Sequence, residues 1–242
     1  MKKKVVAIVQ ARVGSSRLPG KVLKKINKKE AILILLKRLS KSKKIHDIIV
    51  AIPIKKKDDR LYRILIKNNY KVFRGDENNV LKRYYNCAKK FDLKNILRIT
   101  GDNPLVDPKL VDKIVGIYQK KNFDYVSNIE KRTFPKGLDV EVFSFDALKI
   151  AYFNAKNKFD MEHVTPYLRK KKFKRYNHVN KEDFSNIRVT LDTMNDFYLI
   201  KKIYSIIGKK FIYFNDIVQL YKKNKEIFFR EYKELKKELN KK

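Results

Sequence analysis

Several residue types that define common protein classes are scarce in this chain of 242 residues, which has one cysteine, three histidines, no tryptophan, seven glycines and six prolines. The single cysteine, Cys87, cannot form an intramolecular disulfide, and with three scattered histidines it excludes a Cys/His zinc framework. We therefore expect a cytoplasmic protein in which Cys87 is a small packing residue. No internal repeat or Pro/Ser-rich linker divides the sequence, which favours a single domain.

Long hydrophobic runs are also missing. The apolar run after the N-terminal lysines, Val5 to Val9, is too short for the core of a signal peptide, and the run Ala31 to Leu36 ends at Lys37 and Arg38. A membrane-spanning helix needs roughly 20 apolar residues. The sequence thus predicts neither a secretion signal nor a membrane span.

Acidic residues are few, because 26 Asp and Glu stand against 60 Lys and Arg, which gives a formal charge of +34 and a pI near 10.0. Such a charge fits a polyanionic partner, such as nucleic acid or an anionic membrane surface. The excess is mostly lysine spread along the chain, whereas nucleic-acid sites concentrate arginine and aromatic residues on one face. We therefore favour a solvated basic surface and keep a basic nucleic-acid-binding protein as an alternative. The tail over residues 222–242 could equally contact a membrane surface or a partner.

Apolar β-branched runs alternate with segments whose apolar residues recur every three to four positions, which predicts strands and helices in turn. The expected strands are Val5–Val9, Ile48–Ile52, Val72–Phe73, Ile96–Ile99, Tyr125–Ser127, Asp139–Phe143 and Ile187–Leu191. The expected helices are Ala31–Leu39, Arg60–Ile66, Val80–Phe91, Leu110–Tyr118, Phe145–Ala155, Met161–Leu168, Asn195–Ile207 and a basic helical region from Phe214 onward. This order predicts an α/β fold, one mostly parallel twisted sheet with helices on both faces.

The densest motif follows the first expected strand, over Gln10–Lys21. Two glycines allow close approach of the backbone to a ligand, two serines add hydroxyl donors, and three cations gather at the carboxyl end of a strand, where α/β sheets bind ligands. These residues are Gly14, Gly20, Ser15, Ser16, Arg12, Arg17 and Lys21. The spacing of Gly14 from Gly20 does not fit a Walker A motif, and the loop lacks the Gly-x-Gly-x-x-Gly of dinucleotide-binding loops. We therefore expect a loop that binds an anion.

Two acidic turns follow other expected strands. Thr100-Gly101-Asp102-Asn103-Pro104 ends the fourth strand, where the Asp102 carboxylate could ligate Mg²⁺ that bridges phosphates at the basic loop, although the same residues also form a good turn. Asp192 follows the apolar run Val189–Leu191 and is either a second metal ligand or the N-cap of the next helix. The residues alone leave both alternatives open for Asp102, and for Asp192 they favour the N-cap.

Five ordered motifs together resemble the cytidylyltransferase family, which includes the acylneuraminate and 3-deoxy-manno-octulosonate cytidylyltransferases, and they most resemble its spore coat polysaccharide biosynthesis protein F branch. The motifs are the run Ala11–Leu23, the turn 101–104, Pro135–Glu141, Glu162–Tyr167 and Leu191–Thr193. The resemblance implies a glycosyltransferase-A-like (nucleotide-diphospho-sugar transferase) fold, with a nucleotidyltransferase domain over residues 1–210 and a basic helical extension over 211–242. It also implies transfer of CMP from CTP, with Mg²⁺, to a sugar acid, sugar phosphate or related acceptor, with release of pyrophosphate, for surface polysaccharide synthesis.

Carried over motif by motif, the resemblance implies a role for each of three groups of residues. The nucleotide is expected to contact Ala11, Arg12, Gly14, Ser15, Arg17, Lys21, Thr100 and Asp102, of which Arg12, Lys21 and Asp102 are the expected catalytic residues. The expected metal ligands are Asp102 and Asp192, and the expected acceptor-binding residues are Lys136, Asp139, Glu141, Glu162 and His163. His163 could instead be a helix-start residue without a role in the reaction.

Some features depart from the family pattern or leave an alternative. Met194-Asn195-Asp196 stands where many members have Pro-Glu-Asp, which alters the helix start but keeps Asp192. A glycosyltransferase of the same fold usually carries Asp-x-Asp at the metal strand, whereas Asn103-Pro104 follows Asp102, so this alternative is disfavoured. Relatives are commonly homodimers, and we expect the alternating Lys/aromatic stretch Phe173–Val179 to be an arm that reaches the second subunit.

Overall fold

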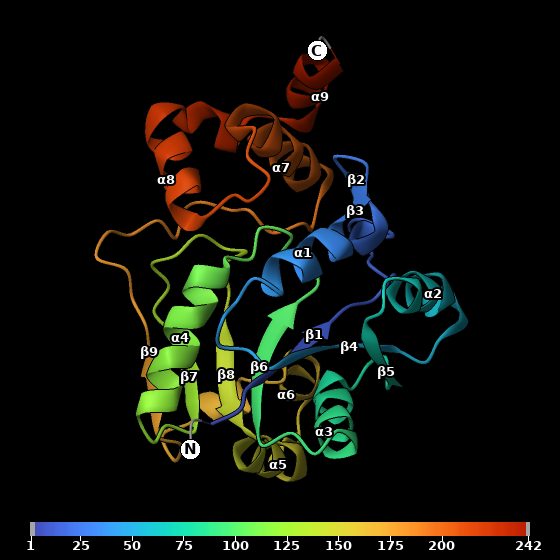
Figure 1. Cartoon of the computed structure of the whole chain (residues 1–242), viewed down its shortest axis with the longest axis vertical. Coiled ribbons are helices and arrows are strands. Elements are labelled where there is room, and N and C mark those ends of the chain that lie inside the picture. Colours follow the sequence, from blue (N-terminus) through green and yellow to red (C-terminus); the bar gives the residue numbers. More distant parts are fainter. Residues whose placement is uncertain (1–2, 241–242) are drawn as a thin grey trace.

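The computed structural model describes residues 3–240, and a seven-stranded sheet lies at the centre of that region (Figure 1). In order across the sheet, the strands are β5 (Lys71–Gly75), β4 (Asp47–Pro53), β1 (Val6–Gln10), β6 (Asn95–Thr100), β8 (Glu141–Ser144), β7 (Tyr125–Ser127) and β9 (Arg175–Asn177). The first four are parallel, β8 runs antiparallel to both of its neighbours, and β9 is parallel to β7. The predicted α/β fold with a mostly parallel sheet is therefore confirmed.

Helices cover both faces of the sheet because successive side chains of each strand point to opposite faces. In β1, Ala7 and Val9 belong to one buried apolar cluster, and Val6 and Ile8 belong to the other. The first cluster is covered by α1 (Ala31–Leu39), α2 (Asp59–Lys67), α4 (Pro108–Lys120), α7 (Met194–Ile207) and α8 (Phe214–Lys223). The second is covered by α3 (Val80–Lys90), α5 (Phe145–Asn154) and the residues that follow α6 (Lys158–His163), namely Val164, Tyr167 and Leu168. Cys87 of α3 is buried in the second cluster, and burial raises the pKa of its thiol to about 12, which fits a packing role.

Short elements connect the sheet and its helices. A two-stranded ribbon pairs β2 (Lys25–Ile26) with β3 (Lys29–Glu30), and four turns are 3-10 helices: η1 (Lys21–Leu23), η2 (Lys56–Asp58), η3 (Tyr167–Arg169) and η4 (Lys225–Phe229). At the C-terminal end, buried residues Leu220 of α8 and Leu235 of α9 (Tyr232–Asn240) belong to the same cluster as the sheet. The boundary at residue 210 stays a prediction. No helix within residues 3–240 has the length and apolar character that a membrane crossing requires.

The expected strand Ile187–Leu191 is wrong, since this segment forms no strand of the sheet. It is an extended segment that forms an isolated parallel bridge with Lys136: the Lys136 N–H donates to the Ile187 carbonyl at 2.9 Å, and the Val189 N–H donates to the Lys136 carbonyl at 2.7 Å. Farther along the segment, the Leu191 N–H donates a hydrogen bond to the Asp102 carbonyl at 2.7 Å. The apolar pattern arises because these side chains are buried against the core while the backbone pairs with two loops.

The expected helix Met161–Leu168 is interrupted. α6 ends at His163, Val164 adopts φ 70° and ψ −55°, and η3 begins three residues later. The Thr165 N–H donates to the His163 carbonyl at 2.8 Å, so Val164 is the centre of a γ-turn of the strained type. Pro166 provides the reason for the break, because a residue that precedes proline is disfavoured in a helical conformation.

The expected dimer arm, Phe173–Val179, does not project from the chain. Its central residues form β9, which pairs with β7 at the edge of the sheet, and Phe173 is buried beneath it. β9 is an edge strand whose side chains are exposed or half-buried, with Tyr176 40% exposed, so the alternation of lysine and aromatic residues does not mark a buried face of the strand. An assembly of two chains stays a prediction, without this segment as its arm.

A buried charged network joins β6 to β8. The Glu141 carboxylate pairs with Arg98 and accepts the Tyr125 hydroxyl at 2.6 Å, while Arg169 lies 3.6 Å away. Glu141 is 1% exposed. Burial alone would raise the pKa of Glu141, but the charges of Arg98 and Arg169 and the hydrogen bonds it accepts outweigh burial and lower it. The carboxylate is therefore an ionised structural group.

We expect Glu141→Gln to lower the free energy of unfolding by about 3 kcal/mol or more at pH 7, because Arg98 loses its buried partner. A carboxyl whose pKa is lowered by folding stabilises the protein above its ordinary pKa and loses that effect as the pH falls through the folded value. The difference between wild type and variant should thus shrink as the pH falls below about 4.5. Urea unfolding at several pH values measures it. Glu130→Gln, which removes a surface pair with Arg175, should cost less than about 1 kcal/mol. A difference that stays constant down to acid pH would contradict an ionised Glu141.

Gly137 holds the segment that carries Asp192 against the loop at Lys136. Its φ is +110°, and a Cβ atom there would lie 2.5 Å from the Thr190 nitrogen and 2.7 Å from the Val189 carbonyl carbon. We expect Gly137→Ala to cost more than about 3 kcal/mol, through backbone strain and collision together. Gly208→Ala is the matched control, because Gly208 also has a positive φ, +64°, but a Cβ atom there would have no neighbour within 4 Å. Urea unfolding should give about 1 kcal/mol for the control; equal costs would contradict the close approach.

Candidate active site

A pocket of about 270 Å³ lies at the carboxyl ends of β1 and β6, where the basic loop, two acidic turns and the end of α6 meet. Ten residues predicted from the sequence line it: Ala11, Arg12, Ser15, Arg17, Lys21, Thr100, Asp102, Glu162, His163 and Asp192. Its other lining residues are Gln10, Ser16, Val22, Val80, Arg83 and Gly101. Segments far apart in the sequence are therefore brought together at one edge of the sheet, as ligand sites of open α/β sheets generally are.

Backbone contacts fix the basic loop over the sheet edge. The Gly101 N–H donates to the Gln10 carbonyl at 2.7 Å, and a Cβ on Gly101 would lie 2.9 Å from both that oxygen and the Ala11 Cβ. On the other side, the Val13 N–H donates to the buried Asp58 carboxylate at 2.7 Å. The loop and the Asp102 turn therefore touch through backbone atoms, which leaves the Arg12, Ser15 and Arg17 side chains at the pocket.

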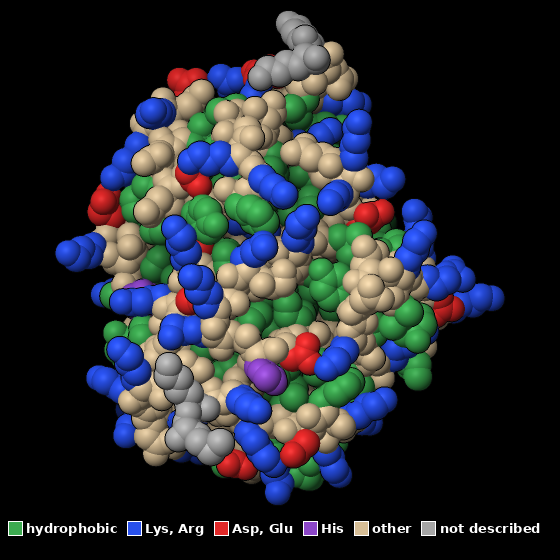
Figure 2. All heavy atoms as spheres, in the orientation of Figure 1, with side chains coloured by type: hydrophobic (Ala, Val, Ile, Leu, Met, Phe, Trp, Pro, Cys, Tyr) green, Lys and Arg blue, Asp and Glu red, His purple; other side chains and the backbone are tan. Residues whose placement is uncertain are grey.

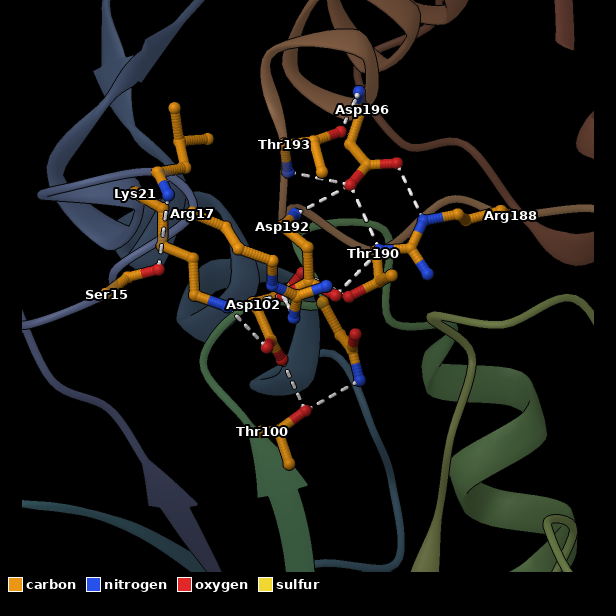
Figure 3. A network of polar contacts seen from close by, with 12 residues as sticks. Ser15, Arg17, Lys21, Thr100, Asp102, Arg188, Thr190, Asp192, Thr193 and Asp196 are labelled. Atoms are coloured by element: carbon orange, nitrogen blue, oxygen red, sulfur yellow. Dashed lines mark hydrogen bonds and ion pairs between the residues drawn. The ribbon is translucent and has the colours of Figure 1, made fainter. Parts of the chain in front are cut away.

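Lys21 joins the two acidic turns. Its ammonium nitrogen lies 2.7 Å from Asp102 Oδ2 and 2.7 Å from Asp192 Oδ1, and its side chain is 13% exposed (Figure 3). The Thr100 hydroxyl donates to the other oxygen of Asp102 at 2.6 Å and accepts from the Asn103 amide at 3.0 Å. Lys21 is expected from the sequence to contact the nucleotide. In the structure its ammonium contacts the two expected metal ligands, Asp102 and Asp192.

Asp192 is not the N-cap of the helix that follows it. That position belongs to Thr193, whose hydroxyl accepts from the Asp196 N–H at 3.2 Å in a capping box at the start of α7. Burial raises the pKa of Asp192, but the hydrogen bonds from Lys21 and Arg188 and the charge of Arg17 outweigh burial and lower it. Because the Asp192 carboxylate is ionised and does not cap α7, it is suited to bind a cation.

The two aspartates fit a magnesium ion whose remaining ligands would be phosphate oxygens of a nucleotide and water. Within residues 3–240, no cluster of three or more His, Cys, Asp or Glu side chains could hold a metal by itself. Mg²⁺ in nucleotide sites usually takes one or two carboxylates, substrate phosphates and water. Asp102 and Asp192 supply two carboxylate oxygens that already contact one cation, the Lys21 ammonium. Oxygen donors of this number and type suit Mg²⁺ and do not suit a soft transition metal.

Glu162 and His163 reach the pocket from the end of α6, directly before the strained Val164 turn. Backbone strain in a buried β-branched residue persists only where the surroundings hold it, and such residues cluster at functional sites. The His163 ring also contacts Phe159, with ring centroids 4.5 Å apart. A second depression of about 370 Å³, lined by Arg12, Asn78, Asn79, Lys158, Met161 and Glu162, adjoins the pocket through Arg12 and Glu162.

Four residues assigned from the sequence do not line the pocket. Gly14 lies in the basic loop but against Lys57, Lys136 pairs with the Asp192 segment, and Asp139 forms a two-pronged ion pair with Arg132 at 2.6 and 3.1 Å. Glu141 lies inside the buried network described above. The motif Pro135–Glu141 therefore holds together the walls of the site, and a direct contact of these residues with an acceptor has no support in this geometry.

Three charged residues of the site are not among those expected from the sequence: Arg188, Asp196 and Arg83. Arg188 donates to Asp192 at 2.7 Å and pairs with Asp196 at 2.8 Å, and Arg83 is buried in the pocket wall. The spacing of Arg188, Asp192 and Asp196, four residues apart each time, was a signal that the sequence offered. No sequence signal distinguishes Arg83, because it is one of several basic residues of the amphipathic helix α3.

Comparisons with known proteins agree with this geometry. The sequence profile of the family described as Cytidylyltransferase matches residues 6–238. An uncharacterised protein of Methanocaldococcus jannaschii is 44% identical over 90% of this chain and 88% of its own length, and the spore coat polysaccharide biosynthesis protein SpsF of Bacillus subtilis is 32% identical over 85% and 88%. The structure of a cytidylyltransferase from Leptospira borgpetersenii superposes with a TM-score of 0.89 and 33% identity, covering 94% of this chain and 98% of that one. The chain therefore belongs to the cytidylyltransferase family and is a nucleotidyltransferase enzyme.

Proposed function

We propose that this enzyme transfers CMP from CTP to a sugar acid, sugar phosphate or related acceptor and releases pyrophosphate, in the synthesis of a surface polysaccharide. The observation that carries the proposal is the pair Asp102 and Asp192, held by Lys21 beside a basic loop at the carboxyl end of β1. Cations stabilise the charge of a triphosphate, and the one or two carboxylates that Mg²⁺ takes in nucleotide sites are supplied by this pair.

In this proposal the chain's own residues bind and orient the nucleotide. Arg12, Ser15 and Arg17 donate to the phosphates from the basic loop, which suits the charge that develops on phosphate oxygens during transfer. Asp102 and Asp192 hold Mg²⁺, which when bound neutralises charge on the triphosphate. No covalent intermediate with the protein is required, since positioning and charge stabilisation supply the catalysis.

The acceptor oxygen attacks the α-phosphorus, the bond between that phosphorus and the bridging oxygen of the β-phosphate breaks, and pyrophosphate leaves with the electron pair. We assign the proton of the attacking hydroxyl to the His163 imidazole, which lines the pocket beside Glu162. Arg12 and Glu162 line both the pocket and the second depression, so a nucleotide and an acceptor could occupy adjoining spaces. Lys158 and Arg12 in the second depression favour an acceptor that carries a carboxylate or phosphate.

The large positive charge does not favour a nucleic-acid-binding protein instead. Lys and Arg side chains are scattered over the face in Figure 2 and do not form a single stripe, as a groove that follows a nucleic-acid backbone would require. The glycosyltransferase alternative stays disfavoured, because Pro104 stands where Asp-x-Asp would place its second carboxylate, and the buried Asn103 amide between them donates to Thr100. A cytoplasmic location and a homodimer remain expectations of the proposed function.

The proposal predicts pyrophosphate release from CTP, and not from ATP, GTP or UTP, when Mg²⁺ and a pool of sugar acids and sugar phosphates are supplied. Asp102→Asn should lower the rate by about 100-fold, because one of the two carboxylates loses its charge. Asp92→Asn is the matched control, since Asp92 is an exposed aspartate that pairs only with Lys94 among its described neighbours. A coupled phosphate assay measures the rate, and calorimetry measures CTP binding.

Each outcome separates one part of the proposal from another. Release with CTP alone that depends on Asp102 supports both the reaction and the carboxylate pair. CTP binding without release means that the pool lacks the acceptor, and the pool is then enlarged. A protein that binds no CTP in the presence of Mg²⁺ contradicts the proposed function.

A further inference from the structure

The two oxygens of the Asp192 carboxylate are held by cations of different kinds. Oδ1 lies 2.7 Å from the Lys21 ammonium and 3.3 Å from the Arg17 guanidinium. Oδ2 lies 2.7 Å from Nη2 of Arg188, which approaches from the opposite side of the carboxylate (Figure 3). Each oxygen therefore has its own cationic partner, and a metal ion must compete with one of them.

Arg188 is fixed from behind by Asp196. Its Nε lies 2.8 Å from Asp196 Oδ1 and its Nη2 lies 3.1 Å from Asp196 Oδ2, which is the two-pronged geometry that suits a guanidinium. Asp196 Oδ2 also accepts the backbone N–H groups of Asp192 and Thr193, at 2.9 and 2.8 Å, as part of the capping box of α7. Arg188 cannot leave Asp192 without disturbing the start of the helix.

The partners of Oδ1 are held less firmly. Lys21 is a point charge on a flexible stem, and the Arg17 side chain is 63% exposed. Both come from the basic loop that is assigned to the triphosphate, so an incoming nucleotide attracts them away from Asp192. Oδ1 can be freed in this way, while Oδ2 stays occupied by a rigid guanidinium.

We propose that Arg188 is a positioning residue, which holds Oδ2 of Asp192 against Asp196 so that Asp192 offers Oδ1 alone to the metal ion that accompanies the nucleotide. This inference rests on the proposed function and deepens it, because it assigns a one-oxygen role to the second metal ligand. Partners behind metal ligands orient them, and their loss typically costs 10-fold to 100-fold in metal affinity. The rival explanation is structural, in which Arg188 only fastens the segment before α7.

The test compares wild type, Arg188→Met and Arg188→Lys, with Arg175→Met as the matched control. Arg175 is also an ion-paired arginine with a similar exposed fraction, 33% against 32% for Arg188, and it lies on β9 away from the pocket lining. Mn²⁺ serves as the probe metal. Electron paramagnetic resonance measures its affinity for the protein–CTP complex, calorimetry measures CTP affinity without metal, and a thermal melt reports folding.

We expect Arg188→Met to weaken Mn²⁺ binding to the CTP complex by about tenfold or more, with metal-free CTP affinity changed less than about threefold. Arg188→Lys should fall between wild type and Arg188→Met, because one ammonium cannot bridge Asp192 and Asp196 as the guanidinium fork does. Arg175→Met should bind Mn²⁺ and CTP as wild type does. If Arg188 only fastened the segment before α7, its loss would not lower metal affinity alone.

Other results overturn the inference. A folded Arg188→Met protein with wild-type Mn²⁺ affinity would remove the positioning role, and equal losses of metal affinity, metal-free CTP affinity and melting temperature would favour the structural explanation. If Arg188→Met does not fold, Arg188→Lys decides, and unchanged Mn²⁺ affinity in that variant overturns the proposal. Wild-type protein that binds no CTP would refute the proposed function and, with it, this inference, whereas wild-type protein that binds CTP and a folded Arg188→Met protein with unchanged Mn²⁺ affinity would together refute the inference alone.

Discussion

The ion triplet of Asp102, Lys21 and Asp192 is the interaction on which the arrangement of the site depends. Both carboxylates contact one ammonium and so lie close together, and like charges about 5 Å apart at an effective dielectric constant of about 20 repel each other by roughly 3 kcal/mol. One ammonium at 2.7 Å from both removes that repulsion and links three segments that are far apart in the sequence. Without a cation at this point, the two carboxylates would repel each other where the loop after β1, the turn after β6 and the segment before α7 meet.

Backbone pairing makes that convergence specific. The segment before Asp192 pairs with Lys136 through Ile187 and Val189 and lies against Gly137. Leu191, the residue directly before Asp192, donates its N–H to the Asp102 carbonyl. The same Asp102 turn approaches the basic loop through Gly101 and Gln10. The basic loop, the Asp102 turn and the Asp192 segment are thus linked to one another through backbone hydrogen bonds. A site built in this way transmits small displacements, because none of its walls can shift independently.

The sequence predicted the sheet and most helices because these depend on local patterns, and it predicted much of the pocket lining through motifs that resemble those of the family. Strands such as β1 and helices such as α1 follow apolar periodicity, and the motifs at strand ends are brought together by the geometry of any parallel sheet. The failures depend on partners that no local pattern contains. Residues 187–191 are apolar and β-branched like a strand, but their backbone partners are loops. The buried guanidinium of Arg83 depends on tertiary contacts in the same way, whereas the break at Val164 had a local signal in Pro166 that the helical spacing of the apolar residues outweighed.

The charge of the chain and the charge of its site have separate physical roles. Around Asp192, the cations Lys21, Arg17 and Arg188 face three carboxylates, those of Asp102, Asp192 and Asp196, so the fixed charges of this part of the site are matched. The surplus of +34 is therefore carried mainly by side chains elsewhere. A positive surface raises the encounter rate with an anionic nucleotide, and salt screens that effect. The matched inner charges lie too close together for salt to screen them, and they hold the segments of the site to one another.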